Sequence, residues 1–194
     1  MDRRDAILKA AKELFAQRGF QATTTCEVAK RAGVAEGTIF HHFTSKRAIF
    51  MHLLEEMRQL YVSETRARMD KASTGLEAIE ELIRFHFEFS RKNSNDIKML
   101  IRDFPPRLME ERTPFREIIV KGMKELTGLV EKSLERGIQD GTIKDISIQE
   151  TTLILQGLLN GLSRLQFFWP VTVTDLTPHV IQFCRRSLDK RCVA

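Results

Sequence analysis

Apolar residues recur every three or four positions through most of the chain, which is the spacing of one face of an α-helix. In the first fifty residues this pattern predicts a helix over about 4–18, a short helix between Thr24 and Gly33, and a third short helix that buries Ile39. Thr24 and Glu27 have the spacing of a capping box, in which each side chain bonds the other residue's backbone amide. Three short helices with a glycine-containing turn before the third predict a helix-turn-helix.

Longer helices are expected in the rest of the chain. Ser45 can cap a fourth helix that runs to about Met69. The later apolar stripes predict helices over about 76–92, 95–104, 113–138, 147–168 and 177–189, with Pro105-Pro106 as a break, Thr177 as a cap and Pro178 at the first helical position. Residues 84–89 alternate as a strand does, but their neighbours are helical, so we expect helix there too.

The predicted fold is therefore all-α. A three-helix helix-turn-helix module over residues 1–46 precedes a larger helical domain over residues 47–194. The 42% apolar and 29% charged composition is that of a soluble globular protein. Nowhere do 18 uncharged apolar residues run together, so no membrane span is expected. Cys26, Cys184 and Cys192 are too few and too scattered for a disulfide framework, which indicates a reducing, cytoplasmic setting.

The positive charge is concentrated at the N-terminal end. Residues 1–50 hold 9 Lys and Arg against 5 Asp and Glu, whereas residues 51–194 hold 22 against 21, and the whole chain carries +5. A basic module beside a nearly neutral remainder favours an anionic partner for that module, either nucleic acid or a membrane surface.

The segment 35–47, AEGTIFHHFTSKR, places two adjacent histidines between phenylalanines. Successive helical residues point about 100° apart, so His41 and His42 cannot easily chelate one metal ion. The sequence has no HExxH motif and no visible pair of nucleophile and base. We therefore expect no metal, no cofactor and no catalytic residue, and hence not an enzyme. Phosphate is the better match for this segment, because a helix starting near Ala35 can enter the major groove.

A wider set of residues over about 4–51 resembles the DNA-binding module of the TetR family of transcriptional regulators. The set is Ile7, Leu8, Ala10, Ala11, Leu14, Phe15, Gly19, Phe20, Thr24, Val28, Ala29, Ala32, Gly33, Val34, Gly37, Thr38, Phe40, His42, Phe43, Lys46 and Phe50. The resemblance implies an all-α homodimer whose C-terminal domain binds a small molecule that releases DNA. It thus implies a sequence-specific regulator, expected to be a repressor released from a palindromic double-stranded operator.

By the same resemblance, Thr38 and His42 are expected to contact the DNA backbone, and Lys46 a phosphate. Phe40 stands where the family usually has tyrosine, and its ring can meet a thymine methyl group. His41 is expected to face DNA or solvent. The expected DNA-contact set is Thr24, Thr25, Cys26, Ala35, Glu36, Gly37, Thr38, Phe40, His41, His42 and Lys46.

Each of these contacts has a purely structural alternative. Glu36 can accept a hydrogen bond from cytosine N4, yet an acidic residue in a first helical turn is favourable without DNA. Cys26 lies where some relatives place a base-reading side chain, or is a variable surface position, or has a redox role. Ala35 replaces the serine or threonine that often caps the recognition helix. Lys46 can equally be a solvated surface charge.

The C-terminal helices suggest a dimer and a pocket. The helix over 147–168 is apolar nearly all round, so it must be covered by its own core and by a second subunit, and Gly157 and Gly161 permit close approach. The last helix, with Val180, Ile181, Phe183, Cys184 and Leu188, can complete a four-helix interface. A pocket for an apolar or aromatic effector would use Phe85, His86, Phe89, Met99, Phe104, Phe115 and Met123, although such residues are usually ordinary core.

Two other classes of protein stay open at this stage. One is a cytosolic all-α small-molecule-binding protein or enzyme with a purely structural helix-turn-helix, which would not bind duplex DNA. The other is a basic peripheral membrane protein, which would bind liposomes. Against the first is the lack of a catalytic constellation, and against the second is the apolar stripe of the first helix, which has core partners in Val28, Val34, Ile39 and Phe43.

Overall fold

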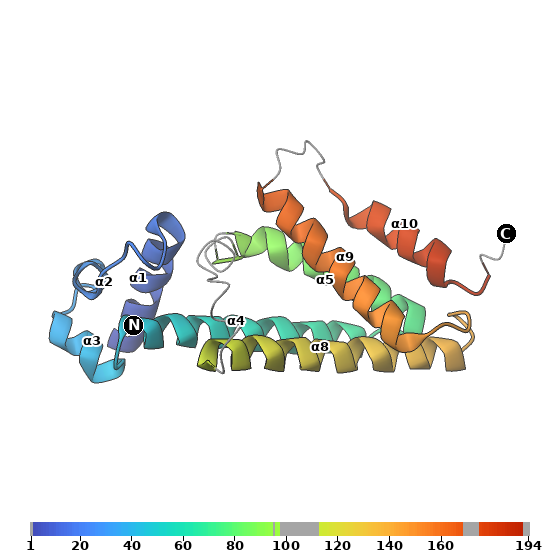
Figure 1. Ribbon diagram of the computed structural model, residues 1–194, viewed down its shortest axis with the longest axis horizontal. Coiled ribbons are helices and arrows are strands. Elements are labelled where there is room, and N and C mark those ends of the chain that lie inside the picture. The colour runs from blue at the N-terminus through green and yellow to red at the C-terminus, as the bar shows by residue number, and fades with distance from the viewer. Residues whose placement is uncertain (1, 95, 98–112, 169–174, 192–194) are drawn as a thin grey trace. The chain divides into compact units, whose positions relative to one another are not determined.

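The computed structural model describes residues 2–94, 96–97, 113–168 and 175–191. Every regular element within these ranges is a helix, which confirms the all-α prediction (Figure 1). The helices are α1 (Arg3–Arg18), α2 (Thr25–Ala32), α3 (Glu36–His42), α4 (Lys46–Met69), α5 (Gly75–Lys92), α8 (Pro114–Gln139), α9 (Ile148–Phe168) and α10 (Thr177–Leu188). None of the helices in those ranges is long and apolar enough to cross a membrane.

The helix boundaries follow the caps that the sequence contains. Ser45 Oγ accepts a hydrogen bond from the backbone N–H of Ala48 at 3.1 Å, as expected for the cap of α4. At α10 the predicted cap was wrong by one position: Leu176 is the N-cap, and Asp175 Oδ1 accepts from the Thr177 amide at 3.0 Å. Most of the helix predicted over 95–104, and Pro105-Pro106, lie outside the described residues.

The chain divides into two compact units. The first unit comprises Met1–Gln59 with Asn93–Val120, and the second comprises Leu60–Lys92 with Lys121–Ala194. Helices α4 and α8 each contribute residues to both units. A functional division after residue 46 stays a prediction.

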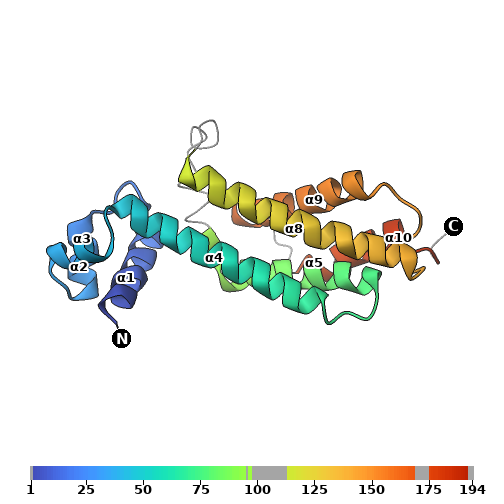
Figure 2. The same cartoon turned by 90° about the horizontal axis from the view of Figure 1, so that it is seen from below.

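The core of the first unit is built where α1, α2 and α3 pack on one another (Figure 2). Ile7, Phe15, Val28 and Ile39 are fully buried in it. The ring of Phe20 lies 5.4 Å from that of Phe15 and 4.9 Å from that of Phe50, measured between centroids. These contacts fix the short helices, which are too short to be stable alone.

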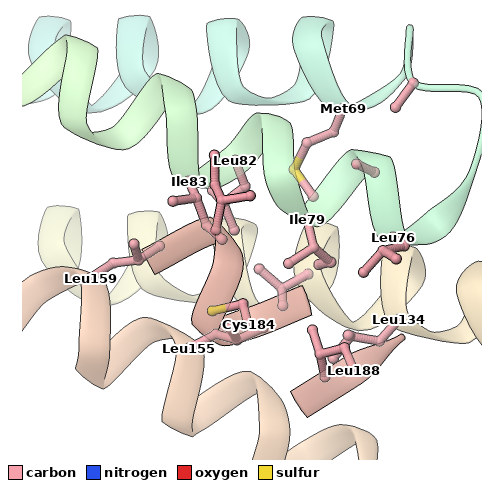
Figure 3. Packing of buried hydrophobic residues seen from close by; sticks show 14 of the residues in the cluster. Met69, Leu76, Ile79, Leu82, Ile83, Leu134, Leu155, Leu159, Cys184 and Leu188 are labelled. Carbon is pink, nitrogen blue, oxygen red and sulfur yellow. The ribbon is translucent and has the colours of Figure 1, made fainter. Parts of the chain in front are cut away.

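The core of the second unit lies between α5, α8, α9 and α10 (Figure 3). Leucines and isoleucines of α5 meet Leu155 and Leu159 of α9 and Cys184 and Leu188 of α10. At one end α5 crosses α8 so closely that a Cβ on Gly75 would overlap the backbone of Gly137. Glu80 of α5 accepts a hydrogen bond from Arg185 of α10 at 2.7 Å, so a buried carboxylate joins these two helices.

Candidate nucleic-acid interface

The N-terminus of α2 is held by the predicted capping box. Thr24 Oγ1 accepts from the Glu27 amide at 3.2 Å, and Glu27 Oε2 accepts from the Thr24 amide at 2.9 Å. The hydrogen bonds from Thr24, backbone first, keep the pKa of the Glu27 carboxyl below its usual range, and Arg18 adds to the effect. The first turn of α2 is therefore fixed by local bonds, and it presents exposed Thr24 and Cys26 to the surroundings.

The turn from α2 to α3 depends on Gly33. This residue has a φ of 68°, a left-handed conformation that costs glycine little and other residues more. The Val34 amide closes the turn by donating to the Ala29 carbonyl at 3.0 Å. Ala35 is the N-cap of α3 and provides no side-chain bond. The orientation of α3 must therefore come from its packing.

One face of α3 is core and the other is open. Ile39 is fully buried and Phe43 nearly so, and both belong to the core of the first unit. Phe40, one position beyond Ile39, is 53% exposed, so its ring lies outside the core. Glu36, Gly37 and His41 are exposed on that face, and Thr38 and His42 are half-buried.

The open face of α3 borders a surface hollow that also involves the start of α1. Its lining comprises Asp2, Arg3, Gly37, Thr38, His41 and His42. Beside the Asp2 carboxylate, the hollow thus holds a guanidinium, a hydroxyl and two imidazoles, which are donors suited to phosphate oxygens. The rings of His41 and His42 stand edge to face with their centroids 5.1 Å apart. Among the described residues no group of three or more His, Cys, Asp or Glu could hold a metal ion.

Glu36 is fixed by a residue of the preceding helix. Thr25 Oγ1, at the first position of α2, donates to Glu36 Oε1 at 2.7 Å. This bond links the first turns of the two helices and leaves Glu36 Oε2 as a further acceptor. Both residues belong to the expected contact set, but no sequence signal predicts a bond between residues eleven positions apart.

The two N-terminal arginines differ in their surroundings. Arg3 is exposed at the hollow. Arg4 points to α4, where its guanidinium lies 2.9 Å from His52 Nε2 and 5.5 Å from the centroid of the Phe43 ring. Arg3 is thus available to an anion, whereas Arg4 is committed to the fold.

Lys46 also has protein partners. Its ammonium donates to the carbonyl oxygens of Phe20 at 2.7 Å and Thr23 at 2.6 Å, and more weakly to that of Gln21 at 3.3 Å. The expected contact of Lys46 with phosphate stays a prediction. The protein contacts were not foreseen, because no sequence signal places a loop carbonyl next to a lysine more than twenty positions away.

The residues expected to form an effector pocket lie in different parts of the structure. Phe85 and Phe89 of α5 are buried in the second unit, where they pack against Tyr61. Phe115 belongs to the core of the first unit and stacks on Phe50. Met123 is 52% exposed. Met99 and Phe104 lie outside the described residues, so the pocket as a whole stays a prediction.

His86 has a complete set of buried partners. Its Nε2 lies 3.1 Å from the Leu159 carbonyl and 2.7 Å from Ser163 Oγ, and its Nδ1 lies 2.7 Å from the Tyr61 hydroxyl. Because a carbonyl can only accept, we assign the proton to Nε2, and Nδ1 then accepts from Tyr61. Burial lowers the pKa of His86 to about 4, despite the opposing bond to Leu159.

The third helix of this helix-turn-helix exposes Phe40 and Glu36 beside a hollow lined mainly by hydrogen-bond donors. These features place the protein in the class of helix-turn-helix proteins that bind duplex DNA. Residues 7–53 match the family model described as bacterial regulatory proteins, tetR family. The chain is 30% identical over 169 residues to the uncharacterized HTH-type transcriptional regulator YhgD of Bacillus subtilis, covering 80% of this chain and 79% of that one. The chain belongs to the TetR family and is a DNA-binding transcriptional regulator.

Two further relatives extend the comparison. The HTH-type transcriptional repressor KstR2 of Mycolicibacterium smegmatis is 28% identical over 142 residues, which are 73% of this chain and 68% of that protein. The solved structure of the transcriptional regulator FadR from Bacillus subtilis in complex with stearoyl-CoA has a TM-score of 0.75 and 22% identity. The matched region covers 92% of this chain and 96% of the FadR chain, so the likeness in fold extends well beyond the helix-turn-helix.

Proposed function

We propose that the protein is a cytoplasmic repressor that binds a nearly palindromic operator as a homodimer and is released by a small apolar ligand. The observation that carries the DNA-binding part is the open face of α3, where Phe40 is 53% exposed although its neighbour Ile39 is fully buried. A large aromatic residue held outside the core by a fixed helix is well placed for contact with a partner. The name of the relative KstR2 supports the assignment as a repressor.

The proposed DNA contacts divide into two kinds. Thr38 and His42 border the hollow with Arg3 and are proposed to bond phosphate oxygens, which sets the position of the helix but reads no sequence. Phe40 and Glu36 are proposed to reach base edges, where a phenyl ring can pack on a thymine methyl and a carboxylate can accept from cytosine N4. Among the other expected contacts, Ala35, Gly37 and His41 adjoin these residues at α3, and Thr24, Thr25 and Cys26 lie at the start of α2.

The proposed dimer uses the outer faces of α9 and α10. Leu155 and Leu159 of α9 face the protein's own core, while Leu153 and Ile154 are 67% and 66% exposed. Gly157 and Gly161, on the same helix, have open space where a Cβ would lie. Such an apolar surface with room for close approach suits a second copy of the helix.

The contribution of α10 is smaller than the sequence suggested. Val180, Ile181, Cys184 and Leu188 are buried in the core of the second unit. They cannot also face a partner, because a side chain that packs on α5 and α9 points away from the outer surface. Phe183, at 62% exposure, is the residue of this stripe that we propose for the interface.

The effector proposed for the first tests is a long-chain acyl-CoA thioester. The support is the likeness in fold to a regulator solved with stearoyl-CoA, together with the aromatic group of Tyr61, Phe85 and Phe89 in the second unit. An apolar acyl chain fits the apolar or aromatic ligand expected from the sequence. Release requires that the ligand prefer the DNA-free form by about 1–3 kcal/mol.

The experiment that tests the function is a selection of duplex DNA by the purified full-length protein, followed by titration of the selected duplex. Saturable binding to a nearly palindromic sequence, weaker at higher salt and weaker again with stearoyl-CoA, is the expected result. Binding to anionic liposomes but not to duplex DNA would indicate the membrane protein instead. If acyl-CoA binds and operator affinity does not change, DNA binding stands and the proposed switch is wrong.

A further inference from the structure

Three carbonyl oxygens of the segment between α1 and α2 point to one cation. The oxygens of Phe20, Gln21 and Thr23 lie 2.7, 3.3 and 2.6 Å from Lys46 Nζ at the start of α4. A lysine ammonium has three N–H donors and no acceptor. Three carbonyls on three donors use the whole hydrogen-bonding capacity of this side chain within the protein.

The ammonium is also covered by an aromatic ring. Nζ lies 4.5 Å from the centroid of Phe20, which is within the range of a cation–π interaction. Phe20 is itself packed on Phe15 and Phe50 of the first unit's core, so the ring is not free to move away. Lys46 is half-buried as a result. A lysine that grips phosphate would instead be expected to keep donors turned to solvent.

The segment that Lys46 binds leads directly into α2. Thr23 is fully buried, and its hydroxyl donates to the Gly19 carbonyl at 2.8 Å, which turns the backbone back on itself. The next residue, Thr24, is the N-cap of α2, and Thr25 bonds Glu36 of α3. The placement of Thr24 and Thr25 therefore depends on how the carbonyls of Phe20 and Thr23 are held.

We propose that Lys46 is a positioning residue that fastens the α1–α2 segment to the first turn of α4, and that its ammonium serves the protein rather than DNA phosphate. The positive charge is attracted to the three carbonyl oxygens around it and fixes the N-terminus of α2, which in turn fixes Glu36 through Thr25. The part of this proposal that concerns DNA rests on the proposed DNA-binding function. The part that concerns the fold does not.

The first test needs no mutation and no DNA. The wild-type protein is treated briefly with an acetylating reagent, and the modification of each lysine is followed by mass spectrometry. Lys46 is expected to react at least about tenfold more slowly than Lys30, which is exposed on α2, because its ammonium is held and partly covered. Equal rates for Lys46 and Lys30 would overturn the proposal.

The second test compares Lys46→Met with Arg47→Met, a control that removes one positive charge from the adjacent exposed position of the same helix. In Lys46→Met, hydrogen exchange at the amides of Thr23 and Val28 is expected to speed up about tenfold or more without DNA. In Arg47→Met, exchange at these amides should match the wild type. Unchanged protection in a folded Lys46→Met protein would overturn the proposal.

The third test uses the salt dependence of DNA binding. If Lys46 positions α2 and touches no phosphate, Lys46→Met lowers affinity but keeps the slope of log affinity against log salt. A slope smaller by about one phosphate would show that Lys46 grips DNA and would overturn the proposal. If the wild-type protein binds no duplex, the proposed DNA function fails, and the acetylation and exchange measurements still decide the role of Lys46.

Discussion

The hydroxyl of Tyr61 on α4 lies 2.7 Å from Nδ1 of His86 on α5, and of these two side chains His86 is buried and Tyr61 is half-buried. Burial raises the pKa of the Tyr61 phenol above its usual range and lowers that of His86. Both shifts favour the neutral forms, in which a phenol donates to an imidazole nitrogen. Protonation of His86 would put a second hydrogen where Tyr61 now donates.

This pair predicts how stability depends on pH. The pKa of His86 is about 4 in the folded protein and near its ordinary 6.5 when unfolded, so between these values the unfolded state binds more protons. The His86 contribution is therefore fully present above about pH 6.5 and is lost as the pH falls towards 4. The loss should approach roughly 3 kcal/mol in denaturant titrations.

The control for this prediction is His179, which is exposed on α10. A His86→Gln protein should be less stable at pH 7 but should lose less stability between pH 6.5 and 4.5 than the wild type. A His179→Gln protein should keep the wild-type dependence. If His86→Gln and wild type decline equally over this range, His86 does not titrate as its burial indicates.

A second prediction concerns the crossing of α5 and α8. Because a Cβ on Gly75 would overlap the Gly137 backbone, which cannot rotate away, Gly75→Ala should destabilise the protein by roughly 1–3 kcal/mol. Gly128→Ala is the matched control, since Gly128 lies within α8 and nothing is within 4 Å of its added Cβ. That variant should be neutral or more stable by about 0.5–1 kcal/mol. Thermal unfolding of both variants measures the difference.

A third prediction concerns the proposed dimer. Gly161→Leu should fit the isolated protomer, because the added side chain meets open space, yet it should block close approach of a partner helix. Sedimentation is expected to show a monomer, with helix content unchanged and operator affinity at least about tenfold lower. Gly128→Leu adds the same side chain at another open helical position and should remain dimeric. If Gly161→Leu remains dimeric and keeps full operator affinity, the dimer interface does not use the Gly161 face of α9.

A fourth prediction concerns base reading. Phe40→Ala and Glu36→Gln should each alter the preferred base at one position of each operator half-site, with a change in discrimination of about 1–3 kcal/mol. Neither side chain is part of the core, so folding stability should stay near that of the wild type. Thr38→Ala, at the hollow, should weaken binding to all sequences about equally. Repeating the duplex selection with each variant separates the two kinds of effect.

The sequence predicted the fold where the signals were local. Thr24 and Glu27 predicted the start of α2, and Gly33 its end, because a capping box and a left-handed glycine involve neighbours in the chain. Helical spacing also predicted the buried Ile39 and Phe43, whereas the exposed position of Phe40 was expected only from the family resemblance. Helix boundaries within the described residues mostly agreed to within one or two positions.

The sequence pattern did not predict contacts between segments that lie far apart in the chain. No sequence pattern pairs the hydroxyl of Tyr61 on α4 with His86 on α5. Phe115 was expected to line the effector pocket with Phe85 and Phe89, yet it stacks on Phe50 in the core of the first unit. Phe115→Trp would therefore disturb that core, and Phe89→Trp, within the Tyr61 group, is the better probe of the effector response.

The open and buried faces of α3 share no side chain. Ile39 and Phe43 hold the helix in place, while Glu36, Phe40 and His41 contribute nothing to the core. Ala35 adds no capping bond that a change on the outer face might disturb. A substitution at Phe40 or His41 therefore leaves the buried side chains that hold α3 in place unchanged. A duplicated copy of this protein could therefore come to regulate different genes through changes at three or four exposed positions of α3.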